Sequence, residues 1–421
     1  MNSPAPSLIP ALVPKAWLVV SLLWPVALLN YLDRQLLATM KKSIMADIPS
    51  IASDENFGRI MSVFMVVYAC LSPIGGFTAD RFNRRWMVIG SLGVWSIVTW
   101  ITGQAHTFNE LWWARAAMGV SEACYIPAAL ALIADFHTGP TRSRAIGVHQ
   151  TGIYAGMALG GLGGWIADSS SWRNGFTGFG FAGVAYAVFL FFALPPKPPA
   201  TAHAAGSVKV LPALKALVCA APFLLLVVHF TLPAISGWVM KNWLPSVLAD
   251  AFHLGQTAAG FAATLYVTLA SLCGALLGGV AADRWMRHTE RGRIYTSAVG
   301  VALMVPALVG IGYSPSLQVA IGFLICFGIG WGFFDANNMP ILCQIVRPEY
   351  RATGYGLMNL VSTAMGAWVT TKMGALRDSG TPLPIIFGIC AGTSAISVAL
   401  VLLIRVKPAP DTALPAVPAE A

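Results

Sequence analysis

The sequence predicts an all-α, polytopic membrane protein with twelve transmembrane helices in two related halves. Three observations lead to this fold class. Hydrophobic residues make up 57% of the chain and charged residues only 10%, whereas a soluble protein carries about 25% charged residues. Apolar runs of membrane-spanning length recur from one end of the chain to the other. A loop motif of the first half also recurs in the second half.

Twelve apolar segments account for the predicted spans. Lys15 and Lys41 bound the first of them, and the 25 residues between these lysines extend for about 37 Å as a helix, enough to cross a bilayer. The N-terminus lacks the basic region and cleavage site of a signal peptide, so this segment is expected to remain as a span. The segments begin near residues 16, 58, 86, 109, 143, 174, 216, 256, 292, 316, 350 and 383.

Basic residues are distributed unevenly over the predicted loops. Of the 26 lysines and arginines, 17 lie in loops on one side, five lie on the other side and four lie inside spans. Because basic loops stay in the cytoplasm, both termini are predicted to be cytoplasmic. The same bias accounts for the basic pI of 9.3 without a nucleic-acid partner. The seven cysteines have no CxxC spacing, and no Cys/His spacing predicts a metal site.

A duplication relates the two halves of the chain. The stretch "GGFTADRFNRR" begins at Gly75 and "GGVAADRWMRH" begins at Gly278, at an offset of 203 residues. A second match, "SRAIG" at 143 against "YRATG" at 350, has an offset of 207 and indicates a repeated six-span unit. A Pro-rich stretch separates the halves. The predicted division is an N-terminal bundle at 1–194, a cytoplasmic linker at 195–215, a C-terminal bundle at 216–406 and a cytoplasmic tail at 407–421.

The loop "GGFTADRFNRR" resembles the motif G-x-x-x-D-R-x-x-R-R between spans two and three of the major facilitator superfamily. This resemblance implies two six-helix bundles that rock around a central cavity and open it alternately to each side. It also implies that a gate formed by Asp80, Arg81, Arg84 and the repeated pair Asp283–Arg284 holds the cytoplasmic side closed. Two further stretches, "NYLDRQLLA" and "RAAMGVSEACYIPA", resemble the anion:cation symporters and also the bacterial spinster-like lipid transporters.

Seven ionisable residues are predicted to lie inside spans, where each costs at least about 2.5–3.5 kcal/mol and therefore suggests a function. The resemblance implies that spans one, four, seven and ten line the cavity. Asp33 and Glu122 are expected to carry the coupling proton, as the matching carboxylates do in the symporters. The alternative is that the charges pair with one another and only position helices. The seven residues are Asp33, Arg34, Arg115, Glu122, Lys241, Asp335 and Lys372.

Arginine stays charged and forks onto a carboxylate. Arg34 and Arg115 are therefore expected to hold a substrate anion, with Lys241 or Lys372 on the opposite half. Amides and aromatic rings nearby suit a polyhydroxylated ligand, although each of them equally suits a hydrogen bond between helices. The further substrate-binding candidates are Tyr31, Tyr68, His149, Gln150, Tyr154, Trp238, Asp335, Asn337 and Asn338.

Small residues recur every four positions in two of the spans. Such a stripe presents a flat surface on which another helix can approach closely, either for static packing or for sliding. The stripe of span five is Gly152, Gly156, Gly160 and Gly164, and the stripe of span eight is Gly274, Gly278 and Ala282.

Import of a small organic anion, such as a sugar acid or another carboxylate, is the function that these patterns favour. The expected mechanism is symport with a proton, with sodium as the alternative coupling ion and no cofactor. A spinster-like carrier of lysolipids or sphingolipids is the second hypothesis. A membrane enzyme is disfavoured because the chain has no HxxxxD, DHHC or GxSxG motif. The expected setting is a bacterial inner membrane, where a monomer contacts substrate and lipid but no nucleic acid.

Overall fold

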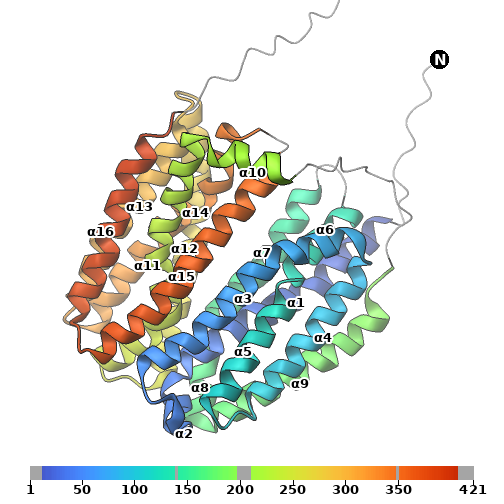
Figure 1. Cartoon of the computed structure of the whole chain (residues 1–421), viewed down its shortest axis with the longest axis vertical. Coiled ribbons are helices and arrows are strands. Elements are labelled where there is room, and N and C mark those ends of the chain that lie inside the picture. Colours follow the sequence, from blue (N-terminus) through green and yellow to red (C-terminus); the bar gives the residue numbers. More distant parts are fainter. Residues whose placement is uncertain (1–11, 138–140, 197–209, 348–349, 406–421) are drawn as a thin grey trace, which may run out of the picture.

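Helices fill the part of the chain that the structure describes. This computed structural model describes residues 12–137, 141–196, 210–347 and 350–405, and these ranges contain no β-strand (Figure 1). The all-α prediction is therefore confirmed. The helices are α1 (Leu12–Thr39), α2 (Lys41–Asp47), α3 (Asp54–Arg81), α4 (Arg84–Thr102), α5 (Phe108–Glu122), α6 (Tyr125–Phe136), α7 (Thr141–Ala158), α8 (Gly161–Ser169), α9 (Trp172–Ala193), α10 (Val210–Val218), α11 (Ala221–Ala251), α12 (Gln256–Met286), α13 (Gly292–Gly312), α14 (Leu317–Ile345), α15 (Arg351–Asp378) and α16 (Leu383–Leu402).

Twelve membrane-spanning units run through these helices. Within the described ranges, nine helices are long and apolar enough to cross a membrane, with α5 and α6 together counted as one. The interrupted pair of α7 and α8, with α4 and α15, supplies the other three. Every span begins within five residues of its predicted position. Most of the predicted linker at 195–215 lies outside the described residues. Its last residues, from Val210 onward, form the first part of α10.

Hydroxyl side chains begin four of the spans. Ser53, Thr107, Ser171 and Ser316 accept hydrogen bonds from amide groups in the first turns of α3, α5, α9 and α14. Such caps satisfy donors that a helix leaves unpaired at its start. These four starts lie at the end of the molecule that carries α2, which is called the α2 end below, and the opposite end is the α10 end (Figure 1).

Two bundles divide the hydrophobic core. Helices α1 to α9 form the N-terminal bundle and α10 to α16 form the C-terminal bundle (Figure 1). One apolar cluster around Leu92 lies in the first bundle, and another around Ile341 lies in the second. A third cluster contains residues of both bundles, including Leu36, Phe57 and Trp243. A smaller cluster also joins Phe64 and Met65 of α3 to Ala367 of α15, so the two bundles share core residues where they meet.

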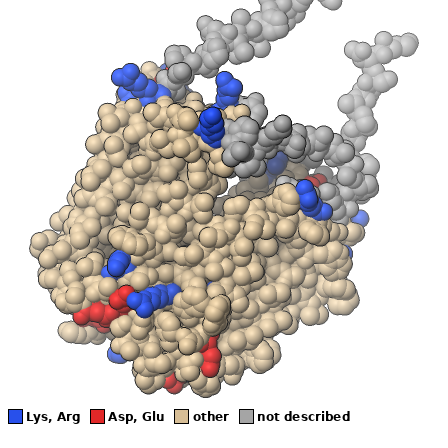
Figure 2. Space-filling view, in the orientation of Figure 1, with Lys and Arg blue, Asp and Glu red and all other residues tan. Residues whose placement is uncertain are grey.

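Contacts between the bundles are concentrated toward the α2 end. The Ser62 hydroxyl of α3 donates to the carbonyl of Ala367 on α15 at 2.7 Å, and the Thr264 hydroxyl of α12 donates to the carbonyl of Ala158 at 3.1 Å. In the described ranges, hydrogen bonds between the bundles reach no further along α3 than Met65 and no further along α12 than Thr264. Figure 2 shows a recess between the bundles at the α10 end, where they separate.

The glycine stripe of span five is a contact surface, as predicted. A Cβ atom on Gly152 would lie 2.7 Å from the carbonyl oxygen of Trp24, and one on Gly156 would lie 3.0 Å from the backbone nitrogen of Leu32. Gly164 meets the first residue of α12, in the other bundle. The stripe thus packs span five against α1 at one part of its length and against the C-terminal bundle at another.

Gly156→Ala should lower the stability of the purified protein. Overpacking of a close contact costs about 1–3 kcal/mol, while alanine regains up to about 1 kcal/mol of helix propensity. We expect the unfolding temperature in detergent to fall by several degrees. Gly147→Ala is the matched control on α7, because no atom lies within 4 Å of a Cβ at that position. Equal unfolding temperatures for the two variants would show that the stripe tolerates larger residues.

Candidate functional site

A small cavity lies between the two bundles. It encloses about 50 Å³, which is room for a few water molecules or one small polar group. Helices α1, α3 and α5 of the N-terminal bundle and α11 and α15 of the C-terminal bundle supply its walls. The lining residues are Arg34, Leu37, Met61, Phe64, Met65, Tyr68, Arg115, Trp238, Lys241, Asn242 and Thr363.

An ion pair between Arg34 of α1 and Glu122 of α5 lies at the wall of this cavity. The Arg34 Nε atom lies 2.6 Å from Glu122 Oε2, and the two side chains are only 9% and 0% exposed. The Nη2 atom of Arg34 and the Oε1 atom of Glu122 are buried without a partner in the described ranges. Buried charges with unused donors and acceptors are costly, so this pair has capacity to bind a further group.

Aromatic rings surround the cations of the cavity. The Arg34 guanidinium lies 4.7 Å from the ring centre of Tyr31 and 4.7 Å from that of Tyr68. The Lys241 ammonium of α11 lies 5.4 Å from Tyr31 and 5.1 Å from Trp238. Ring faces attract cations. Tyr31 therefore lies between a cation of the N-terminal bundle and a cation of the C-terminal bundle.

Arg115 adds a third cation. Its side chain is buried on α5, with the guanidinium 4.8 Å from the ring of Phe64 and Nη1 2.8 Å from the sulfur of Met118. Its Nε atom has no hydrogen-bond partner within the described part of the chain. Three cations thus line the cavity, and among the described residues one of them, Arg34, is paired with a carboxylate, Glu122. The surplus of positive charge suits an anionic ligand.

A break in the fourth span places Glu122. The residue ends α5, and α6 begins at Tyr125. Pro127 lacks the amide hydrogen that would bond to the carbonyl of Ala123, which interrupts the helix there. A Cβ on Gly75 would lie 3.2 Å from the Cα atom of Cys124, so α3 packs directly against the break. Irregular backbone at membrane depth occurs where protein or a cavity surrounds it, which agrees with a functional site.

Asp33 lies inside the N-terminal bundle rather than at the cavity. The Thr99 hydroxyl of α4 donates a hydrogen bond to its Oδ2 atom, and the side chain is buried. The Oδ1 atom has no partner among the described residues, and neither does the side-chain amide of the neighbouring Asn30. Asp33 and Glu122 are therefore two buried carboxylates with different partners, Thr99 for Asp33 and Arg34 for Glu122.

Three of the predicted substrate-binding residues do not line this small cavity. His149 is fully buried within the N-terminal bundle, with Nε2 3.0 Å from the hydroxyl of Tyr125. The Asn337 amide donates to the carbonyl of Phe333 on its own helix, at 2.8 Å. Lys372 is exposed on α15 and does not line the cavity, because its long stem lets the ammonium reach solvent.

Four more predicted residues also do not line the cavity. Gln150 is exposed on α7, and Asn338 is buried on α14 with an amide that has no partner among the described residues. Asp335 is exposed on α14 and interacts electrostatically with Tyr154 of α7. Asp335 and Tyr154 belong to opposite bundles, so their interaction crosses the space between the bundles outside the small cavity.

The predicted cytoplasmic gate lies at the separated α10 end. Arg84 forms an ion pair with Asp135 of α6, within the N-terminal bundle. Arg81 and the pair Asp283–Arg284 are exposed. The Asp80 side chain lies outside the described residues. The described ion pair of Arg84 thus stays within one bundle, in agreement with the separation of the two bundles at this end.

Sequence reasoning missed the apolar part of the cavity lining. Met61, Phe64 and Met65 were not predicted, and they follow helical spacing on α3 with Tyr68, which was predicted, so the four share one face of that helix. Within a membrane span, however, apolar residues face lipid, protein and cavity alike. These residues lie three, four and seven positions before Tyr68, and this spacing could have identified the face, whereas hydrophobicity alone could not.

Two six-helix bundles around a charged cavity at membrane depth define a membrane transport protein. The sequence profile described as "Major Facilitator Superfamily" matches residues 23–370, and the chain belongs to this superfamily. The predicted superfamily is therefore confirmed.

Several relatives carry the spinster name, one of the two branches that the motifs resemble. The chain is 26% identical to "Protein spinster" of Drosophila melanogaster over 370 residues, which cover 83% of this chain and 60% of that protein. It is 25% identical to an "MFS-type efflux pump" of Mycolicibacterium smegmatis, over 93% of this chain and 89% of the pump. A crystal structure of a bacterial spinster homologue, described as inward-facing and occupied, superposes with a TM-score of 0.77 at 19% identity, over 94% of this chain and 99% of that one.

Proposed function

We propose that the protein is a proton-coupled secondary transporter that imports a small organic anion, such as a sugar acid or another carboxylate. The observation that carries this proposal is the meeting of Arg34, Arg115 and Lys241 at one cavity, where, among the described residues, Glu122 is the one carboxylate paired with these cations. A bound carboxylate would supply the missing negative charge. Because the cations come from both bundles, an anion between them would also draw the bundles together.

The ion pair couples the anion to a proton. While Glu122 is ionised, it competes with a substrate anion for Arg34. A proton on Glu122 removes this competition, so proton binding and anion binding favour each other, as linkage requires for symport. Asp33, buried next along the chain from Arg34, is the second proposed proton carrier.

Orientation follows from the distribution of basic residues. With the basic loops in the cytoplasm, the α2 end faces outside and the separated α10 end faces inside. The conformation described here would then be open to the cytoplasm, ready to release substrate. We place the protein as a monomer in a bacterial inner membrane, with both termini inside.

A thermal-shift screen of the purified protein tests the substrate class. Ligands that bind only the folded state raise the unfolding temperature, and the stabilisation grows with the logarithm of ligand concentration over Kd once that ratio exceeds one. Sugar acids and other carboxylates should stabilise the protein, and their alcohol analogues should not. In proteoliposomes, the stabilising acid should accumulate only when the outside is acidic. If an acid binds but accumulates equally without a pH gradient, its transport is not coupled to protons.

A lipid with an anionic headgroup is the second candidate substrate. Two methionines and two aromatic rings, Met61, Met65, Phe64 and Trp238, line the cavity beside the cations, and apolar walls of this kind suit an acyl chain. Lysolipids should be included in the same screen. Stabilisation by lysolipids without any response to small carboxylates would favour this candidate over the first.

A further inference from the structure

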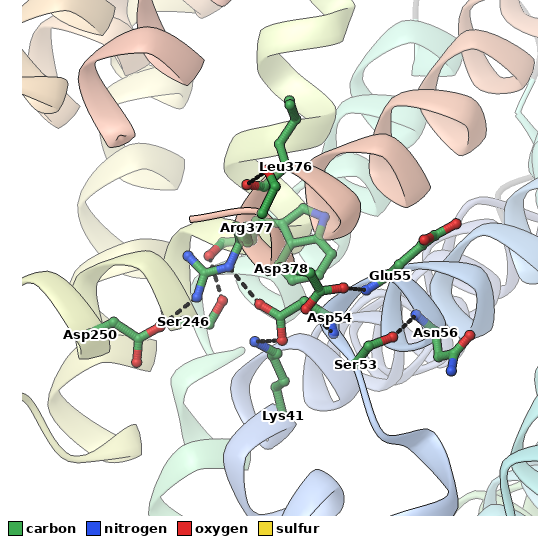
Figure 3. Close-up of polar contacts among 12 residues, drawn as sticks. Lys41, Ser53, Asp54, Glu55, Asn56, Ser246, Asp250, Leu376, Arg377 and Asp378 are labelled. Carbon is green, nitrogen blue, oxygen red and sulfur yellow. Dashed lines mark hydrogen bonds and ion pairs between the residues drawn. The ribbon is translucent and has the colours of Figure 1, made fainter. Parts of the chain in front are cut away.

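The α2 end is closed by a helix cap that crosses between the bundles. Asp378 at the end of α15 lies against the start of α3 (Figure 3). Its two carboxylate oxygens accept hydrogen bonds from the backbone N–H groups of Asp54 and Glu55, at 2.9 Å and 2.8 Å. A carboxylate at this position accepts hydrogen bonds from donors that the helix leaves unpaired. Its negative charge also interacts favourably with the positive end of the helix dipole. The C-terminal bundle therefore completes a helix of the N-terminal bundle.

The reciprocal contact occurs at the start of α12. Asp168 near the end of α8 accepts hydrogen bonds from the backbone N–H and the hydroxyl of Thr257, at 2.8 Å and 2.7 Å. It also accepts one from the side-chain amide of Gln256 at 3.1 Å. Gly255 precedes the helix and has no side chain with which to cap it. The N-terminal bundle therefore completes a helix of the C-terminal bundle.

The two capping segments share a sequence pattern. The N-terminal bundle has "GWIAD" at Gly164–Asp168 and the C-terminal bundle has "GALRD" at Gly374–Asp378, at an offset of 210 residues. In both, the glycine lies one turn before the capping aspartate, and a Cβ on it would collide with the backbone carbonyl of the first residue of the capped helix. The glycine thus permits the close approach that brings the aspartate to the amide groups.

Among the described residues, ion pairs accompany the cap formed by Asp378 but not the cap formed by Asp168. Arg377 pairs with Asp54 at 2.7 Å and also with Asp250, while Lys41 pairs with Asp54 at 2.6 Å (Figure 3). Burial lowers the pKa of the Lys41 ammonium below its ordinary value, although the nearby Asp54 acts to raise it. The cost of burying the charge therefore offsets part of the stabilisation that this ion pair provides. Asp168 has hydroxyl and amide partners instead. The aspartate cap is the feature that the two contacts have in common.

We propose that the two Gly-x-x-x-Asp segments are matched clasps that hold the α2 end closed, and that both must release before the cavity can open toward that end. Releasing a clasp exposes the amide groups of a helix start to water and costs the free energy of one helix cap. The duplication provides one clasp per bundle, so the α2 end closes at two places around the cavity. This inference is independent of the substrate and of the coupling ion.

Distance measurements between spin labels test the clasps. Labels at Ala46 on α2 and at Tyr313 after α13 lie on exposed residues of opposite bundles at the α2 end. They would be introduced in a background with the seven native cysteines replaced. Asp168→Asn and Asp378→Asn each keep one acceptor oxygen but lose the second acceptor and the negative charge, so each should shift the ratio of open to closed distances by about 3- to 10-fold, the effect of losing one hydrogen bond. The double variant should show the product of the two shifts.

Two matched controls separate a clasp from general destabilisation. Asp47 pairs with Arg173 at 2.8 Å within the N-terminal bundle at the same end, so Asp47→Asn should leave the distances unchanged. Gly374→Ala should open the α2 end, while Gly388→Ala should not, because no atom lies within 4 Å of a Cβ there. The measurement needs neither substrate nor pH gradient, so a failed transport assay would not affect it.

One result would overturn the clasps. If the double variant has the same distance distribution as wild type and Asp47→Asn, the aspartates do not hold the α2 end closed. Should the double variant aggregate, the two single variants and Gly374→Ala give the same test. Opening by Asp47→Asn as large as that by Asp378→Asn would equally count against the proposal, since it would assign the effect to surface charge.

Discussion

Glutamine in place of Glu122 should abolish uptake driven by a pH gradient while leaving substrate binding intact. Glutamine keeps the shape of the side chain but cannot release a proton, so Arg34 would lose its charged partner permanently. We expect accumulation in proteoliposomes to fall to the level of empty vesicles. Binding should become insensitive to pH, whereas wild type should bind the anion more tightly as the pH falls, because protonation of Glu122 removes a competing charge.

Glu110→Gln is the matched control for this experiment. Glu110 lies on the same helix, α5, but is exposed in its first turn, at the opposite end of the helix from Glu122. Its replacement should change neither accumulation nor the pH dependence of binding. If Glu122→Gln accumulates substrate at the wild-type rate, the coupling proton is carried elsewhere, and Asp33→Asn becomes the decisive variant.

The helical fold could be predicted because a membrane limits the choices of the backbone. A span must satisfy its own amide groups, so length and hydrophobicity suffice to locate it. The prediction for "NYLDRQLLA" also held at the level of the helix, since Asp33 and Arg34 lie inside α1. Hydrophobicity did not predict that α5 ends at Glu122, because α5 and α6 together have the composition of one continuous span. Pro127 was the available signal for that break.

The site could be predicted only in part because a sequence does not give the rotation of each helix. Arg34, Arg115 and Lys241 do line one cavity. Neighbouring residues on a helix point about 100° apart, however, so Asp33 faces Thr99 inside the bundle while Arg34 faces the cavity. His149 is directed into the N-terminal bundle in the same manner. Such directions depend on packing between distant segments, which no local pattern specifies.

Methionine in place of Lys241 should weaken binding of the substrate acid by at least tenfold. Methionine keeps an unbranched, flexible stem but removes the charge that the C-terminal bundle contributes to the cavity. Loss of one partner of a desolvated charge pair costs about 2 kcal/mol or more, and about 1.4 kcal/mol corresponds to a factor of ten. The alcohol analogue of the acid should bind weakly to wild type and no more weakly to the variant, because it has no charge for Lys241 to match.

Lys372→Met completes the comparison, because Lys372 is the other lysine predicted to hold the substrate, and it lies on the same bundle but is exposed. Competition binding of the acid and alcohol pair to all three proteins measures the discrimination between charged and neutral ligands. Discrimination should fall at least tenfold in Lys241→Met, where Arg34 and Arg115 remain, and should be retained in Lys372→Met. If wild type binds the acid and the alcohol equally, the cavity does not select for negative charge, and the apolar wall of α3 would then determine the substrate. If both lysine variants lose discrimination, both lysines contribute to binding of the anion. The exposed Lys372 would then have to move toward the cavity when the bundles close.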